Sequence, residues 1–147
     1  MPRFMFIIKS NHDAEGGAMP PQEALEAMTA YNSSLSAAGI LLAGEGLHPT
    51  KEGARVTFTD DVDARPPTVT KGPFTSDPVH TLVAGFWLVR CKDLDEALSW
   101  VKKCPLKLEG AQIEVRRIHE AEDFGHEFTP ELRAEEERIR KEVEGRK

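Results

Sequence analysis

The sequence predicts an α+β domain built on an antiparallel sheet, and three observations support this fold class. Segments 4–8 and 82–89 are almost continuously apolar, as strands covered on both faces are. Two other segments carry apolar residues at three- and four-residue steps, as helices with one buried face do. Shorter polar stretches with turn residues lie between them. Together they give the order strand, helix, strand, hairpin, strand, helix, strand.

The N-terminal half begins with a strand over Arg3–Lys9, in which five apolar residues lie between charges. Residues 10–19 have the composition of a loop. Pro20 and Pro21 then open a helix, which Gly39 ends as a left-handed cap. The strands that follow are short: 40–46, and then 54–59 and 68–71, which form a hairpin of polar outer strands.

The C-terminal half contains the second strongly apolar strand, over 82–90, and a helix that starts at the capping box Asp93-Leu94-Asp95-Glu96. Pro105 stops this helix, and a last strand lies within 110–118. The resulting βαββαβ order is typical of the ferredoxin-like fold, whose first and third main strands lie mid-sheet. Both helices then cover one face, so we expect a homodimer that packs sheet against sheet.

The chain divides into a domain over residues 1–118 and a charged, mostly helical extension over 119–147. Thr129 and Pro130 form a good helix start. Leu132, Ile139 and Val143 then give a narrow apolar stripe, which would allow the helix to dock on a partner subunit. A solvated terminal helix explains the same pattern equally well.

Charge and composition exclude several classes of function. A formal net charge of -6 and a pI near 5.4 argue against nucleic-acid binding and against docking on an anionic membrane. No apolar run approaches the roughly 18 residues of a membrane span, and a signal-peptide pattern is missing, so we expect a cytoplasmic protein. Cys91 and Cys104 are interpreted as reduced thiols that pack as small hydrophobes.

Four motifs stand out along the chain, at residues 39–46, Gly72-Pro73-Phe74, Gly85-Phe86-Trp87, and 93–97 with Trp100. They resemble those of the YCII-related proteins, most closely the branch named after a D-G-P-F motif. The resemblance covers roughly Pro2 to Ile118 and implies a ferredoxin-like fold in a dimeric α+β barrel. Many members are uncharacterised, and related folds include small enzymes that act on ring compounds, such as muconolactone isomerase and a dehydrochlorinase.

Three departures from the family pattern affect its functional residues. The leading aspartate of D-G-P-F is Lys71 here, so the role of that acid is lost or changed in sign. The loop 75–81 is longer than usual and lacks the family's glutamate. The His–Asp dyad proposed for other YCII-related proteins has its histidine on the first helix, where this chain offers only Tyr31 and Asn32 as polar ring or amide groups. That dyad cannot be carried over.

Glu45 is the strongest candidate for a catalytic residue. It stands between two glycines near a strand end, and glycines let backbone approach closely, as in a pocket wall. In a cleft between sheet and helices, apolar neighbours would make it a general base; an exposed carboxylate is the alternative. His48 is the candidate acid–base partner, although a solvated histidine is commoner on a loop bounded by proline.

Four further residues are candidates for ligand binding. Lys71 would attract an anion from the turn ahead of Phe74, and an ordinary surface lysine is the alternative. Tyr31 would offer its hydroxyl to a ligand, although a place in the apolar stripe of its helix is favoured. Trp87 would face a pocket, although packing in a core or interface is favoured.

No cofactor and no metal are expected. The chain lacks the phosphate-loop, dinucleotide and nucleophile-elbow motifs. The acidic and histidine side chains near the start of the extension do not have the spacing of a zinc-binding helix. They are His119, Glu122, His126 and Glu127.

The sequence leaves the function open between classes. One hypothesis is a small dimeric enzyme that needs no cofactor and performs proton abstraction or elimination on a cyclic or anionic metabolite. Another is a non-catalytic dimer that binds a small ligand or regulates, which the missing first-helix histidine favours. A purely structural dimer is the third. One fold hosts all three, so fold class does not choose between them.

Overall fold

The computed structural model describes residues 1–61, 63–74 and 81–146. The chain forms two compact units, Met1–Arg117 and Ile118–Lys147. A four-stranded antiparallel sheet with strand order β2-β5-β1-β6 is the centre of the first unit. The two strongly apolar segments are its central strands, which confirms the ferredoxin-like arrangement predicted from the sequence. The strands are β1 (Arg3–Lys9), β2 (Leu41–Gly46), β5 (Val83–Arg90) and β6 (Ile113–Arg117).

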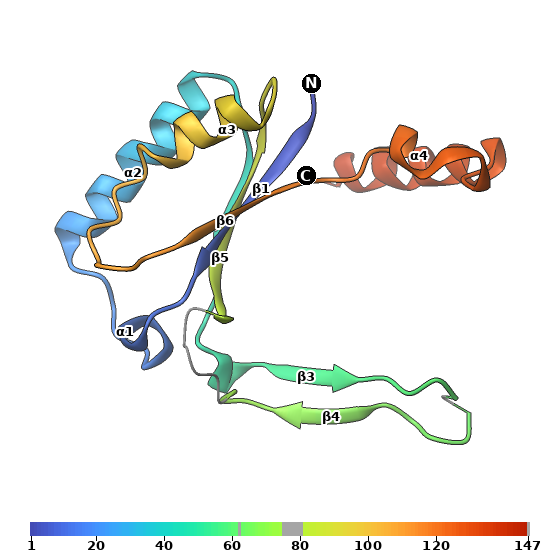
Figure 1. Cartoon of the computed structure of the whole chain (residues 1–147), viewed down its shortest axis with the longest axis horizontal. Coiled ribbons are helices and arrows are strands. Elements are labelled where there is room, and N and C mark those ends of the chain that lie inside the picture. Colours follow the sequence, from blue (N-terminus) through green and yellow to red (C-terminus); the bar gives the residue numbers. More distant parts are fainter. Residues whose placement is uncertain (62, 75–80, 147) are drawn as a thin grey trace. The chain divides into compact units, whose positions relative to one another are not determined.

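Two helices, α2 (Gln22–Ala37) and α3 (Leu94–Val101), lie on the same face of the sheet (Figure 1). Gly39 follows α2 with a φ of 74°, so it has the left-handed conformation expected of a cap. At the start of α3, the carboxylate of Asp93 accepts a hydrogen bond from the backbone N–H of Glu96 at 2.9 Å. The end of α2 and the start of α3 therefore follow the sequence signals.

The core lies between the sheet and these helices. Alternate residues of the central strands point into it, with Phe6 opposite Trp87 and Phe4 opposite Val89. The predicted coverage of both strand faces is not found within one chain, because α2 and α3 lie on the same side. The buried apolar residues in this cluster are Phe4, Phe6, Tyr31, Leu35, Ile40, Trp87, Val89, Cys91 and Ala97.

The prediction of a loop over residues 10–19 was wrong in part. This segment contains a one-turn helix, α1 (His12–Glu15). The side chain of Asn11 caps it by accepting a hydrogen bond from the backbone N–H of Ala14 at 2.8 Å. A turn this short has no apolar periodicity, so only its cap residue could have indicated it.

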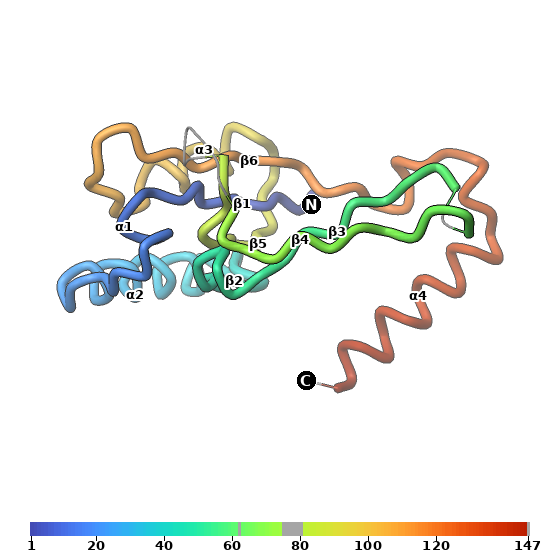
Figure 2. Tube along the Cα trace, turned by 90° about the horizontal axis from the view of Figure 1, so that it is seen from below, coloured from blue at the N-terminus to red at the C-terminus, as the bar shows by residue number. Residues whose placement is uncertain are grey.

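The hairpin forms a second sheet of two strands, β3 (Ala54–Thr57) and β4 (Thr68–Lys71). It is not the edge of the main sheet, because Pro49 and a 3₁₀ helix at Thr50–Glu52 separate it from β2. Figures 1 and 2 show the hairpin projecting from the main sheet on the side away from α2 and α3.

The second unit consists of a 3₁₀ segment over Ala121–Glu127, interrupted at Gly125, and the helix α4 (Pro130–Glu144). Thr129 caps α4 as predicted, accepting a hydrogen bond from the N–H of Leu132. The guanidinium of Arg133 donates to the carbonyls of Phe128 and Ala121 and so ties the segment to the helix. Among the described residues, no helix is both long enough and apolar enough to cross a membrane.

Candidate functional site

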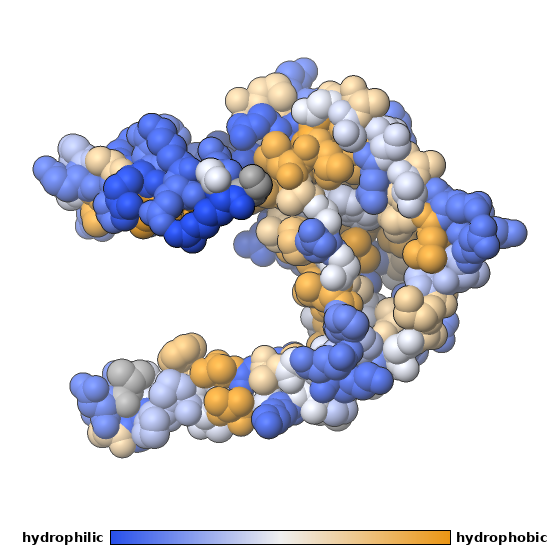
Figure 3. All heavy atoms as spheres, turned by 180° about the vertical axis from the view of Figure 1, so that it is seen from behind, coloured by the Kyte–Doolittle hydropathy of each residue, from blue (hydrophilic) through white to orange (hydrophobic). Residues whose placement is uncertain are grey.

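The sheet face turned away from the helices carries an apolar centre between charged edges. Phe86 and Leu88 of β5 lie opposite Ile7 and Met5 of β1, and all four side chains are half-buried. We call this surface the open face. Figure 3 shows apolar atoms gathered over the sheet region of the first unit. Contiguous exposed apolar patches of this kind mark contact surfaces.

Glu45 lies on the open face, at the β2 edge, and is exposed. It does not line the expected cleft between sheet and helices, because α2 and α3 cover the opposite face. Its partner across the strands is Phe86, so the carboxylate ends a row in which Phe86 and then Ile7 follow across the sheet. Glu114 of β6 ends the same row at the opposite edge and is paired with Lys9 at 3.4 Å and with Arg116 at 3.3 Å. Among the described residues, Glu45 has no hydrogen-bond or ion-pair partner. The two acids of this row thus differ, because the carboxylate of Glu114 is paired with two cations and that of Glu45 has no partner among the described residues.

The glycines around Glu45 are explained by close packing between β2 and β5. A Cβ at Gly44 would lie 2.7 Å from the Cδ1 atom of Trp87, and a Cβ at Gly85 would lie 2.8 Å from the carbonyl oxygen of Glu45. The glycines therefore make room for an indole on one face and for the neighbouring backbone. This close approach is what the sequence motif indicated, although a pocket wall was only one interpretation of it.

Tyr31 and Trp87 lie on the opposite face of the sheet from Glu45. Trp87 is opposite Gly44, one residue away from Glu45, and side chains alternate along a strand. The Trp87 indole N–H donates to the Oδ1 atom of Asn32 at 2.7 Å, and the Tyr31 hydroxyl donates to the carbonyl of Trp100 at 2.8 Å. Burial raises the pKa of Tyr31. Both side chains are buried with their polar atoms bonded, so the structure gives them a packing role.

His48 is paired with Glu52 instead of Glu45. Its Nδ1 atom lies 2.9 Å from the Oε2 atom of Glu52, and 82% of the His48 side chain is exposed. His48 and Glu45 are therefore close in sequence but do not form the expected acid–base pair. The 3₁₀ helix at Thr50–Glu52 brings Glu52 to the histidine, and the sequence pattern had not indicated that helix.

The Lys71–Phe74 turn is held by residues that the sequence analysis did not select. The hydroxyl of Thr50 accepts a hydrogen bond from the backbone N–H of Phe74 at 2.9 Å. The same hydroxyl donates to the carboxylate of Glu15. These contacts join α1, the 3₁₀ helix and the turn, which are distant in sequence and carry no shared motif. Thr50 and Glu15 could not have been found from spacing alone.

Lys71 and Phe74 have different surroundings within this turn. Lys71 is exposed on β4. The Phe74 ring is half-buried beneath the guanidinium of Arg55, whose Cζ atom lies 4.0 Å from the ring centroid. Lys71 is thus an exposed lysine, whereas the Phe74 ring already has a cation on one side. Residues 75–80 of the long loop that follows this turn lie outside the described residues.

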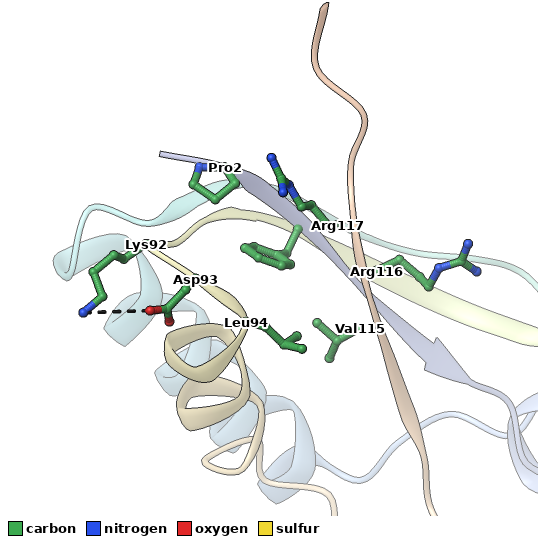
Figure 4. A pocket seen from close by; sticks show the side chains of 8 residues that line it. Pro2, Lys92, Asp93, Leu94, Val115, Arg116 and Arg117 are labelled. Atoms are coloured by element: carbon green, nitrogen blue, oxygen red, sulfur yellow. Dashed lines mark ion pairs between the residues drawn. The ribbon is translucent and has the colours of Figure 1, made fainter. Parts of the chain in front are cut away.

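A separate pocket of about 410 Å³ lies at the start of α3 (Figure 4). Leu94 of α3 and Val115 of β6 approach each other at its base, and Lys92 and Arg117 lie at its rim. Lys92 is 3.9 Å from the carboxylate of Asp93. None of these residues was predicted as a site, because the pocket combines three segments that are far apart in sequence. Glu45 does not line it.

The order of the strands and the pairing of β1 with β5 agree with the resemblance seen in the sequence. The profile of the YCII-related domain matches residues 3–122, which include the whole four-stranded sheet and its helices. The chain belongs to the YCII-related family. A comparison with curated proteins gave no significant match.

Among solved structures, this YCII-related chain is similar to 5-chloro-2-hydroxyhydroquinone dehydrochlorinase from Burkholderia phenoliruptrix AC1100 in complex with 2,5-dihydroxybenzoquinone. The two sequences are 16% identical, and the match covers 84% of this chain and 98% of the other, with a TM-score of 0.44. At this identity and TM-score, the likeness bears on neither substrate nor reaction.

Proposed function

We propose that this YCII-related protein is a small dimeric enzyme that needs no cofactor and uses Glu45 as a general base. The observation that carries the proposal is the unpaired carboxylate of Glu45 beside Phe86 on the open face, in contrast to the paired carboxylate of Glu114. We also assign the chain to the DGPF-type branch, on its Gly72-Pro73-Phe74 sequence.

In this proposal a second copy covers the open face and turns it into the wall of a chamber. Two sheets packed face to face would remove Phe86, Leu88, Met5 and Ile7 from water, which favours the dimer. The same event would desolvate Glu45. A carboxylate that loses water without gaining a cation becomes a stronger proton acceptor. The chamber would therefore suit abstraction of a proton from carbon, with loss of a leaving group or return of the proton elsewhere.

The proposed substrate class is a small cyclic or anionic metabolite. The apolar side chains of the open face would contact a ring, and Lys71 would attract an anionic group from the hairpin base. His48 has no step in this mechanism, because its imidazole is already paired with Glu52. Tyr31 and Trp87 support the sheet from its other face. A cytoplasmic location remains part of the proposal, on the sequence argument.

The alternative is a non-catalytic dimer that binds a small ligand. The pocket at the start of α3 favours it, because that pocket carries Lys92 and Arg117 at its rim and lies apart from Glu45. In that case a small anion would be held near α3, and Glu45 would be dispensable. This alternative and the enzyme make opposite predictions for Glu45.

A screen followed by two matched variants tests the proposal. Small cyclic carboxylates and lactones are screened for raising the melting temperature of the full chain, and each hit is incubated to detect conversion. Glu45→Gln is expected to bind a hit but to lose turnover by about 100-fold or more, the usual contribution of a general base. Glu114→Gln, which changes the paired acid of the same face, is the control and should keep its turnover. Equal turnover in both variants would refute the assignment of Glu45, and binding without conversion in every protein would support the binding module.

A further inference from the structure

The β3–β4 hairpin has one apolar face, and this face is exposed. We call its strands and their immediate continuation, 53–61 and 63–72, the arm. Every residue of β3 and β4 is exposed. Val56 and Val69 are directly opposite each other and are 50% and 59% exposed, and Phe58, two residues after Val56, is 70% exposed. An isolated two-stranded hairpin is marginally stable in water, so the arm needs a covering surface.

The base of the arm is nevertheless firmly fixed. The backbone N–H of Gly72 donates to the carbonyl of Gly53 at 2.8 Å, which closes the hairpin at its base. A Cβ at Gly72 would lie 1.7 Å from the carbonyl oxygen of Thr50. The chain is therefore packed tightly at the base of the arm, against the 3₁₀ helix. An element that is fixed at its base and bare along its length is suited to contact another molecule.

The direction and length of the arm indicate which molecule that is. The arm projects on the side away from α2 and α3, which is also the side of the open face (Figures 1 and 2). Its paired part has four residues in each strand, and four residues at about 3.3 Å each extend for roughly 13 Å. Two sheets packed face to face lie about 10 Å apart. An arm of this length therefore reaches past a second sheet placed on the open face.

We infer that the arm of each subunit packs along the flank of a second copy of this chain, with Val56, Phe58 and Val69 against it. This inference rests on the face-to-face dimer of the proposed function and adds a second contact surface to it. By two-fold symmetry both arms make the same contact. The chamber between the two open faces is therefore flanked by an arm from each subunit. Lys71, at the arm base, is carried to the same region.

The test compares charges placed on the two faces of the arm. The double variant Val56→Asp/Val69→Asp puts charges on its apolar face. The control, Thr57→Asp/Thr70→Asp, puts the same two charges on the other face of the same strands. The dimer dissociation constant of the full chain is measured by sedimentation equilibrium. We expect the first variant to weaken the dimer by about tenfold or more, as loss of a buried apolar contact does, and the control to change it little.

Hydrogen exchange on the unmodified chain gives a second measurement that does not depend on a variant folding. The amides of β3 and β4 should become more protected as the protein concentration is raised through the dimer transition. The arm contact is overturned if both double variants have the dimer dissociation constant of the wild type and if the protection of the arm amides does not change with protein concentration. That result would leave the sheet dimer intact. A wild-type chain that stays monomeric overturns both.

Discussion

Gly72 lets the base of the hairpin pack against the 3₁₀ helix at Thr50–Glu52 because it has no side chain. A Cβ there would lie 1.7 Å from the carbonyl oxygen and 2.5 Å from the carbonyl carbon of Thr50, which are backbone atoms that cannot rotate away. Thr50 is itself held by the carboxylate of Glu15 and by the N–H of Phe74. The glycine of the G-P-F sequence therefore has a steric explanation that is independent of any ligand.

Gly72→Ala is accordingly expected to lower the free energy of unfolding by about 1–3 kcal/mol, the usual cost of overpacking. Urea denaturation measures the change. Gly46→Ala is the matched control, because a Cβ at Gly46 meets no atom within 4 Å. Its effect should stay within about 0.5 kcal/mol. Equal effects of the two substitutions would show that the turn does not pack against Thr50 as described.

Burial raises the pKa of both cysteine thiols. It raises the pKa of Cys104 to about 11, and it raises that of Cys91 to about 11 with help from the carboxylates of Glu96 and Asp93. Both pKa values are above the ordinary value of 9.0, so folding favours the protonated thiols. Their contribution to stability is complete below about pH 9 and is lost as the pH rises through about 11.

The fall in the free energy of unfolding between pH 8.5 and 11, measured by urea denaturation in reductant, should thus be smaller in Cys104→Ala than in the wild type, because one raised thiol is missing. Comparing the slopes of the two proteins separates this effect from the titration of lysines, which both proteins share. Parallel slopes would show that Cys104 is not buried as described.

At the scale of elements, α3 depends on a cap that the sequence revealed. Asp93 accepts from the N–H of Glu96, while the Glu96 carboxylate accepts from the N–H of Lys92 at 2.6 Å. The start of α3 also borders the pocket that Lys92 and Arg117 line. The cap therefore fixes the position of Leu94, which lines the same pocket. The capping-box pattern correctly predicted this helix start.

Asp93→Ala should cost about 1 kcal/mol of stability, as loss of an N-cap does. Asp95→Ala removes an exposed acid of the same first turn and should cost only the few tenths expected from the helix dipole. Thermal unfolding followed by circular dichroism compares the two variants. If Asp95→Ala proved the more harmful, the cap would be misassigned.

The strands show where sequence reasoning works and where it stops. The long apolar runs identified β1 and β5 as the centre of the sheet, because only central strands need such runs. The faces of β2 were not readable: a register shift between Leu41 and Ala43 decides that Gly44 meets Trp87 and that Glu45 meets Phe86. That shift arises from pairing between distant segments, so Glu45 and Trp87 could not be assigned to opposite faces from spacing.

At the scale of the whole molecule, the sequence singled out Glu45 as a candidate, but it did not indicate the contacts between the residues around it. Flanking glycines singled out Glu45, and the structure leaves its carboxylate without a partner among the described residues. The partners of His48 and Thr50 depend on a 3₁₀ helix and on α1, neither of which has a periodic signal. Short elements joined by side-chain hydrogen bonds are therefore the part of the site that the sequence did not specify.

The covering of the open face by a second copy is the central claim, and sedimentation equilibrium of the full chain tests it most directly. The wild type should be a dimer at micromolar concentrations, because Phe86 and its neighbours gain from burial. Phe86→Asp should be a monomer there, whereas Leu25→Asp, on the exposed surface of α2, should remain a dimer. A monomeric wild type, or a Phe86→Asp protein that dimerises as tightly as the wild type, would contradict the account.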